Sequence, residues 1–107
     1  MRDDSEKLLD INDAIERINK YAVRGKETFQ KEELIQTWIV HHLLVLGEAA
    51  AKISDEFKAG HSDIPWSKII GMRNILVHDY FQIDIDIVWA VIEKDLPQLT
   101  EMIKKAL

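Results

Sequence analysis

Apolar residues recur at helical spacing along nearly the whole chain, and only four glycines and two prolines interrupt its 107 residues. In the first segment they follow one another at steps of three and four, which places them on one stripe of a helix. A short alternation over residues 83–87 is too brief for a sheet. The pattern therefore predicts an all-α fold, a four- to five-helix up-and-down bundle with short connections. The first stripe consists of Leu8, Ile11, Ile15, Ile18 and Ala22.

The second segment, residues 31–57, is longer and more apolar than the first. We expect one helix over this range, after a connector that runs from Gly25 through Thr28. Its apolar residues occupy so much of the helix surface that the helix must be covered on more than one side. This favours a central bundle helix, or one that also contacts a second subunit. The main predicted stripe consists of Leu34, Trp38, Leu46, Ala49, Ala50, Ile53 and Phe57, and Ile35, Ile39, His42 and Leu43 widen it.

Capping and helix-breaking residues mark the remaining helices. Pro65 suits the first turn of a helix, where its missing N–H costs nothing, and this helix should run to about His78. Asp84 and Asp86 are candidate N-caps of the next helix. Pro97 should break or kink that helix before a last short one. The apolar face expected between these caps and the kink consists of Ile87, Val88, Val91, Ile92 and Leu96.

The composition narrows the class of protein. A chain of 107 residues supports a single domain over residues 1–107. The absence of cysteine excludes a disulfide framework, a thiolate metal site and a cysteine nucleophile. No apolar run approaches the roughly 20 residues that span a bilayer, and the charged N-terminus lacks a signal-peptide core. We therefore expect a cytoplasmic protein without a membrane partner.

Helical bundles often bind metal ions between facing helices, but the ligand patterns for such sites are missing. No glutamate has a histidine three residues later, as di-iron bundles require. His41, His42, His61 and His78 include no pair three to five residues apart, the usual spacing of helical zinc sites. The chain also has no glycine-rich phosphate loop. We therefore expect neither a metal ion nor a cofactor.

Three polar residues interrupt the apolar stretch 38–51 of the second segment. His41 and His42 are expected at the edge of the core, satisfied by a neighbour or by water. Glu48 must be paired or reach solvent, because an isolated buried charge is very costly. Two roles remain open for Glu48: a structural ion pair, or a support that holds an arginine of an active site.

The residues best suited to catalysis lie within residues 71–80. Asn74 and His78 are four apart and share a helix face, whereas Arg73 must curl its long side chain to reach the imidazole. An imidazole exchanges a proton near neutral pH, and a guanidinium binds phosphate through paired hydrogen bonds. The pair suits metal-independent RNA cleavage. His78 would move the proton of a ribose 2′-OH, and Arg73 would stabilise charge on the phosphorane.

Residues 73–80, Arg-Asn-Ile-Leu-Val-His-Asp-Tyr, resemble the Arg-x4-His-x-Tyr motif of HEPN domains, specifically of the HepT-like toxin family. Four flanking segments strengthen this resemblance. They are Leu-Gly-Glu-Ala-Ala at 46–50, Ile-Pro-Trp at 64–66, Ile-Ile-Gly-Met at 69–72 and Asp-Leu-Pro-Gln-Leu at 95–99. The resemblance extends over essentially the whole chain, with its segments in the expected order.

The resemblance implies an all-helical, HEPN-like homodimer in which two copies of the motif face each other across a cleft. It implies a metal-independent endoribonuclease that acts as the toxin of a type VII toxin–antitoxin pair on RNA and not DNA. Arg73 and His78 would be catalytic, and Asn74 a supporting polar group. The antitoxin partner would be a minimal nucleotidyltransferase (MNT) that transfers AMP from ATP to Tyr80. The added negative charge and bulk beside His78 would then block RNA binding.

Two other interpretations of the same residues stay open. In one, the chain is a non-catalytic helical module that docks a nucleotidyltransferase partner or binds a nucleotide or RNA. The net charge of −5 and the acidic first helix favour this alternative slightly. In the other, the chain is a plain structural bundle in which His78 and Tyr80 are ordinary buried polar groups.

The charge distribution bears on how RNA could be held. Residues 1–59 carry 9 basic and 12 acidic groups, and residues 60–107 carry 5 and 7, so neither part is basic. Residues 64–80 have a net charge of +1, which a homodimer would double. We therefore expect RNA to be held locally at the paired motif, with a shallow salt dependence.

Overall fold

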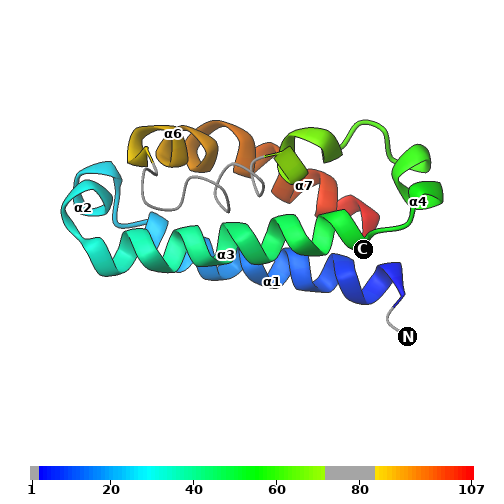
Figure 1. The fold of residues 1–107 in the computed structure, drawn as a ribbon, viewed down its shortest axis with the longest axis horizontal. Coiled ribbons are helices and arrows are strands. Elements are labelled where there is room, and N and C mark those ends of the chain that lie inside the picture. The colour runs from blue at the N-terminus through cyan, green and yellow to red at the C-terminus, as the bar shows by residue number, and fades with distance from the viewer. Residues whose placement is uncertain (1–2, 72–83) are drawn as a thin grey trace.

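A computed structural model describes residues 3–71 and 84–107, which are helical apart from short connections (Figure 1). The predicted all-α class is confirmed. The antiparallel helices α1 and α3 form the most extensive helix pair, and α6 and α7 lie along the opposite side of the molecule. The elements are α1 (Asp4–Ala22), α2 (Lys26–Lys31), α3 (Glu33–Lys52), α4 (Asp55–Gly60), helical residues 66–71, α6 (Ile85–Ala90), the π-helical turn η2 (Val91–Asp95) and α7 (Leu96–Ala106).

The core lies between the α1–α3 pair and the second layer of helices. The predicted stripe of α1 is confirmed, because its four leading members are at most 2% exposed and Ala22 packs against them. Each fully buried aliphatic side chain of this size contributes about 1.5–3 kcal/mol relative to its exposed state. The largest fully buried side chains are Phe29, Ile11, Ile15, Ile18, Ile39, Leu43, Leu46 and Ile103.

A short helix replaces the connector that we expected after α1. The chain turns at Gly25, whose φ of 94° lies in the region that glycine adopts without steric cost. Helix α2 then begins at Lys26. Phe29 is 1% exposed, and its ring centroid lies 5.3 Å from that of Trp89. Because this anchor comes from a distant helix, local sequence signals did not reveal α2.

The single helix expected over residues 31–57 is wrong, because α3 ends at Lys52 and α4 begins at Asp55. Ser54 between them is extended, and its hydroxyl oxygen accepts a hydrogen bond from the Phe57 N–H at 3.1 Å. Ser54 also donates its N–H and its hydroxyl to the Asp4 carboxylate, at 2.9 and 2.6 Å. This tertiary contact with the start of α1 stabilises the break.

Two apolar residues that we expected in buried faces point outwards. Leu34 is 84% exposed and Ile87 is 63% exposed. Adjacent helix residues point about 100° apart, and in each case the following residue, Ile35 or Val88, is the buried one. Both buried neighbours belong to the predicted apolar faces, so the prediction is wrong only in extending these faces to Leu34 and Ile87.

The start of α6 agrees with the prediction, and the helix is irregular before α7, where the prediction placed a break or kink. The Asp84 carboxylate accepts hydrogen bonds from the N–H groups of Asp86 and Ile87, at 2.9 and 3.4 Å. Pro97 cannot donate a helical hydrogen bond, and the helix ahead of it widens into η2, where the Leu96 N–H bonds the Val91 carbonyl. The helix is thus rearranged rather than ended at the proline.

Helix α3 differs from our expectation that no apolar run approaches the length that spans a bilayer. With 20 residues it is long and apolar enough, by length and composition alone, to cross a membrane. Half of its most apolar stretch is buried inside the protein. A core helix of a globular bundle has this property, and α3 packs along the whole of α1.

Candidate functional site

The motif residues Arg73, Asn74, His78 and Tyr80 lie outside the described residues, as does the predicted helix end at His78. The structure does describe both flanks of the motif, at Gly71 and Asp84.

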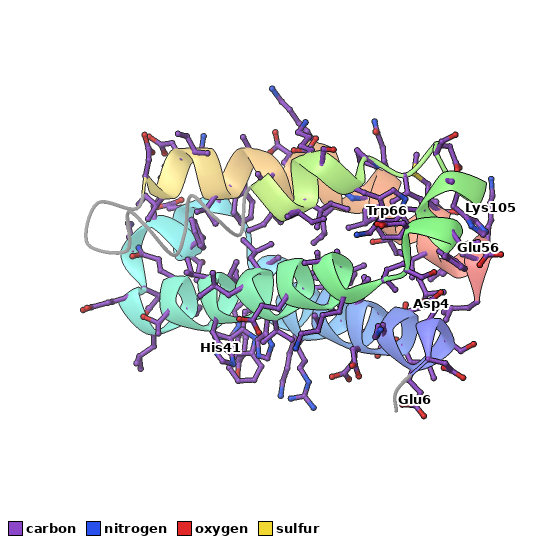
Figure 2. The ribbon with its side chains drawn as sticks, turned by 45° about the vertical axis from the view of Figure 1, so that its right-hand side comes forward. Asp4, Glu6, His41, Glu56, Trp66 and Lys105 are labelled. Carbon is purple, nitrogen blue, oxygen red and sulfur yellow. The ribbon has the colours of Figure 1, made fainter. Side chains whose placement is uncertain are left out.

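The helix that leads into the motif, residues 66–71, is anchored in the core at its start. Ile64, Trp66 and Ile69 are all less than 9% exposed. The indole N–H of Trp66 donates to the carbonyl of His61 at 3.1 Å, which fixes the turn before the helix (Figure 2). The Ile69 N–H bonds the Pro65 carbonyl at 3.1 Å, so the first helical turn starts directly at the proline. The motif thus follows a helix with a rigid beginning.

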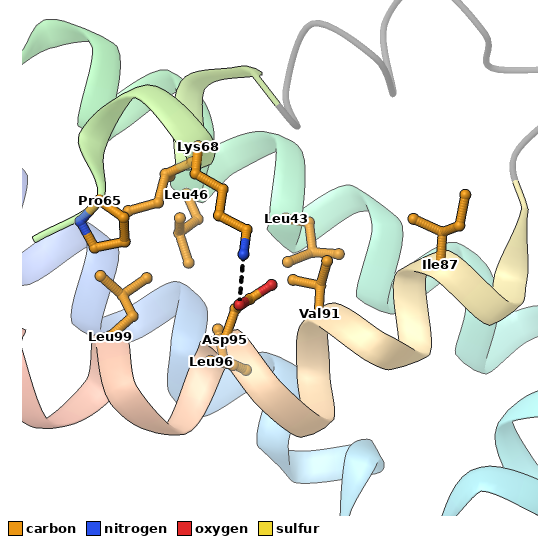
Figure 3. Close-up of a pocket in the computed structure, with 10 residues that line it drawn as sticks. Leu43, Leu46, Pro65, Lys68, Ile87, Val91, Asp95, Leu96 and Leu99 are labelled. Carbon is orange, nitrogen blue, oxygen red and sulfur yellow. Dashed lines mark hydrogen bonds and ion pairs between the residues drawn. The ribbon is translucent and has the colours of Figure 1, made fainter.

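An ion pair joins this helix to the α6–α7 layer. The Lys68 Nζ lies 2.9 Å from the Asp95 Oδ1 at the end of η2 (Figure 3). Below the pair lies a cavity of about 200 Å³, lined by aliphatic side chains such as Leu43, Leu46 and Leu99. The two charged groups among the described lining residues already pair with each other, so these residues offer no free group for acid–base chemistry.

Glu48 lies on the exposed side of α3 and reaches solvent. Among residues 3–71 and 84–107 it has no ion-pair partner. Because its carboxylate reaches solvent, Glu48 needs no ion-pair partner, and the described part of the chain supplies none. Its carboxylate stays available to a cation from elsewhere.

The two adjacent histidines of α3 have different environments. His41 is exposed, whereas His42 is 8% exposed and is a buried polar residue. The His42 ring packs edge-on against Trp38, with centroids 4.5 Å apart. Burial lowers the pKa of His42 below 6.5, and the positive charges of His41 and Arg17 lower it further, while Asp13 opposes them. His41 therefore lies outside the core, and no hydrogen bond from a described residue satisfies the buried His42.

No three histidine or acidic residues come together at metal-binding distance within residues 3–71 and 84–107. The expectation of a metal-free site remains a prediction, because the motif itself is outside these ranges.

A cluster that we did not recognise from sequence lies at the end of α1 and the start of α3. It combines three cations with two aromatic rings that pack edge-on, and we call it the basic–aromatic patch. A signal for it was present, because residues 17–26 contain four basic and no acidic side chains. Averaging the charge over residues 1–59 concealed this run. The patch consists of Arg17, Lys20, Tyr21, Arg24 and Trp38.

Comparison with known proteins gives a consistent result. A family model described as ribonuclease HepT-like matches residues 11–106. "Probable ribonuclease HepT" of Thermococcus cleftensis is 32% identical over 105 residues, which cover 97% of this chain and 96% of that protein. A "putative RNase" of Caldanaerobacter subterraneus subsp. tengcongensis is 37% identical over 81 residues, 76% of this chain and 72% of that protein.

A longer relative carries the same region beside another activity. The "Gamma-glutamylcyclotransferase and putative RNase" of Methanocaldococcus jannaschii is 32% identical over 96 residues, which cover 89% of this chain and 43% of that protein. No solved structure matches the chain.

Proposed function

Since the chain belongs to the ribonuclease HepT-like family and is an endoribonuclease, we propose that it cleaves RNA without a metal ion, as the toxin of a type VII HEPN/MNT toxin–antitoxin pair. The observation that carries the proposal is the Arg-x4-His-x-Tyr motif at residues 73–80, within the matched range 11–106. We further propose that residues 1–107 form one cytoplasmic domain that acts on RNA and neither on DNA nor at a membrane.

In the proposed reaction, His78 and Arg73 have separate roles. The His78 imidazole takes the proton of the ribose 2′-OH as the oxygen attacks the phosphorus, and the Arg73 guanidinium stabilises the charge that develops on the phosphorane. Asn74 is a supporting polar group. Glu48 is a candidate to hold Arg73 in place, since its carboxylate is exposed and unpaired within the described residues.

We propose that the active form is a homodimer with the two motifs across a shared cleft. Support comes from α3, because half of its most apolar stretch is left unburied in one copy of the chain. Leu44 and Val45 on this helix, beyond Trp38, remain partly exposed. A second copy that covered these two residues would remove apolar surface from water. Light scattering at several protein concentrations tests the dimer, and a strictly monomeric active enzyme would exclude it.

The cognate antitoxin would be a minimal nucleotidyltransferase that transfers AMP from ATP to the hydroxyl of Tyr80. The new phosphodiester at Tyr80 forms as pyrophosphate leaves, and its negative charge repels the RNA phosphate from Arg73 and His78. Mass spectrometry after incubation with an MNT partner and ATP should show an AMP increment. The same increment on Tyr80→Phe would contradict this site.

The catalytic assignment is tested with purified protein and single-stranded RNA under single-turnover conditions. His78→Ala and Arg73→Ala should each lower the cleavage rate by about 10²–10⁴-fold, while their circular dichroism spectra remain helical. His61→Ala is the matched control, because His61 lies after α4, where it stacks on Phe57 and bonds the Phe57 carbonyl. Unchanged cleavage by both motif variants would refute the assignment, and strong inhibition by EDTA would refute the metal-free mechanism.

The alternative is a non-catalytic module that docks a nucleotidyltransferase or binds a nucleotide or RNA. It is favoured by the net charge of −5 and by the acidic first turn of α1, where Asp4 and Glu6 lie. The same single-turnover assay discriminates the two functions. Wild-type protein that cleaves no RNA but binds the MNT partner would support the module.

A further inference from the structure

The end of α1 is unusually basic for a chain with a net charge of −5. Residues 17–26 include four basic and no acidic side chains. Arg17 forms an exposed ion pair with Asp13 at 2.8 Å, which leaves Lys20, Arg24 and Lys26 as a local excess of positive charge. Attraction to the helix macrodipole explains a cation in the last turn of a helix. It does not explain why aromatic rings gather beside these cations.

Two rings form the floor of the basic–aromatic patch. Tyr21 and Trp38 pack edge-on, with centroids 5.4 Å apart and ring planes at 81°. The indole N–H of Trp38 donates to the Arg17 carbonyl at 2.7 Å, which ties α3 to α1 and fixes the ring. Both rings remain partly exposed. The floor is therefore rigid and accessible.

The cations lie over these rings. Lys20 Nζ is 5.7 Å from the Tyr21 centroid and 6.0 Å from that of Trp38, and the Arg24 guanidinium carbon is 4.9 Å from the Tyr21 centroid. Among residues 3–71 and 84–107, the cation–ring contacts of this kind involve Lys20 and Arg24 alone. The exposed cations Lys104 and Lys105 at the end of α7 have no such partner within these ranges.

A buried polar group adjoins the same floor. The imidazole of His42, 8% exposed, packs against Trp38 and has no hydrogen-bond partner among the described residues. Buried polar groups nearly always have such a partner. Beside it, His41 is exposed on the side of α3 that faces away from α6 and α7 (Figure 2). The patch thus continues from α1 onto α3.

We propose that the basic–aromatic patch is a second RNA subsite, which binds an unpaired stretch of the substrate strand away from the cleavage motif. Lys20 and Arg24 bind backbone phosphates, and a base stacks against the Tyr21 side of the floor. Cations along the backbone with rings for the bases are the usual construction of single-strand sites. An acidic peptide would use the cations and leave the rings without a role, and duplex RNA hides its base faces.

This subsite rests on the proposed ribonuclease function, and it changes how the RNA is expected to be held. Each phosphate contact to a single strand adds about 0.7 to the slope of log K against log salt concentration. Lys20 and Arg24 together therefore add about 1.4 to the slope. This corresponds to about 25-fold tighter binding at 0.1 M than at 1 M salt. The RNA affinity would therefore depend more steeply on salt concentration than we expect from the motif alone.

The charge part of the proposal is tested by binding, separately from cleavage. The probe is a fluorescein-labelled 2′-O-methyl RNA of about 12 nucleotides without self-complementarity, which has no free 2′-OH to react. Fluorescence anisotropy should show that Lys20→Gln/Arg24→Gln binds about 25-fold more weakly than wild type at 0.1 M salt, with a slope lower by about 1.4. The control, Lys104→Gln/Lys105→Gln, removes the same charge from the end of α7 and should bind like wild type.

The stacking part has its own variants. Tyr21→Leu keeps an apolar side chain over Trp38 but removes the ring, and it should weaken binding by at least about fivefold. Tyr21→Phe retains the ring and should bind like wild type. Binding of the single strand should also exceed that of a duplex of the same length.

Three results would overturn the subsite. They are equal binding by the Lys20→Gln/Arg24→Gln variant and its α7 control, equal binding of duplex and single strand, or loss of the homodimer in the patch variants. Failure of the ribonuclease proposal is distinguishable, because it would appear as absent cleavage of ordinary RNA by wild type whatever the patch variants bind.

Discussion

Replacing the buried histidine of α3, His42→Leu, should stabilise the protein and remove part of its pH dependence. His42 is 8% exposed, and its ring nitrogens have no hydrogen-bond partner within the described residues. An unpartnered buried polar group costs about 1–3 kcal/mol. The edge-on contact with Trp38, at 4.5 Å, returns about 0.5–1.5 kcal/mol. Leucine removes both the unpartnered ring nitrogens and the edge-on ring contact, so the variant should be more stable than wild type by about 1 kcal/mol at pH 7.5.

The pH dependence follows from the direction of the pKa shift. Burial first, and then the charges of His41 and Arg17, hold the pKa of His42 below 6.5 in the folded protein. The unfolded chain therefore binds a proton more readily. The contribution of His42 to stability is constant above about pH 6.5 and falls as the pH drops from there towards the folded pKa. Between pH 7.5 and 5.5 the loss approaches about 1.4 kcal/mol if the folded state stays neutral.

Urea unfolding followed by circular dichroism at pH 7.5, 6.5 and 5.5 measures both quantities. The difference in unfolding free energy between His42→Leu and wild type should grow as the pH falls. The control is His41→Leu, which changes the adjacent exposed histidine and should leave most of the pH dependence in place because burial is its main cause. A pH slope for His42→Leu equal to that of wild type would refute the argument. A loss of 2 kcal/mol or more would show instead that His42 is hydrogen-bonded.

Three further predictions concern the described fold. Ile39→Ala empties a fully buried position and should cost about 2–5 kcal/mol, seen as a drop in melting temperature of at least about 8 °C; a smaller drop would mean that the core collapses around the gap. Ser54→Ala removes the cap of α4 and should cost about 0.5–2 kcal/mol in urea unfolding, while the exposed control Ser67→Ala should stay near wild type. Lys68→Gln breaks an exposed ion pair with Asp95 and should change stability by less than about 1 kcal/mol; a larger loss would show that the pair stabilises the helix before the motif.

The parts of the fold that sequence predicted correctly depend on local rules. The stripe of α1 is buried as its spacing indicates, Asp84 caps α6, and Pro97 coincides with a helix irregularity at η2. In each case the deciding interaction lies within one or two helical turns. Such interactions can be inferred from residue types and spacing alone.

The parts that sequence missed depend on contacts between distant segments. Helix α2 is held by Phe29 against Trp89, and the break before α4 is held by Ser54 bonding Asp4. The outward direction of Leu34 depends on which face of α3 meets α1. No local pattern specifies these choices, because the partner residue is at least 50 positions away in the first two cases.

The same division applies to function. By itself the sequence determined the all-helical class, the absence of cysteine chemistry and the Arg-x4-His-x-Tyr motif at residues 73–80. These follow from composition and from residues close in the chain. Only the tertiary structure placed Trp38 beside Tyr21 and buried His42, which packs against Trp38. The antiparallel packing of α1 on α3 brings the basic end of one helix over the aromatic start of the other, and no spacing within either helix contains that information.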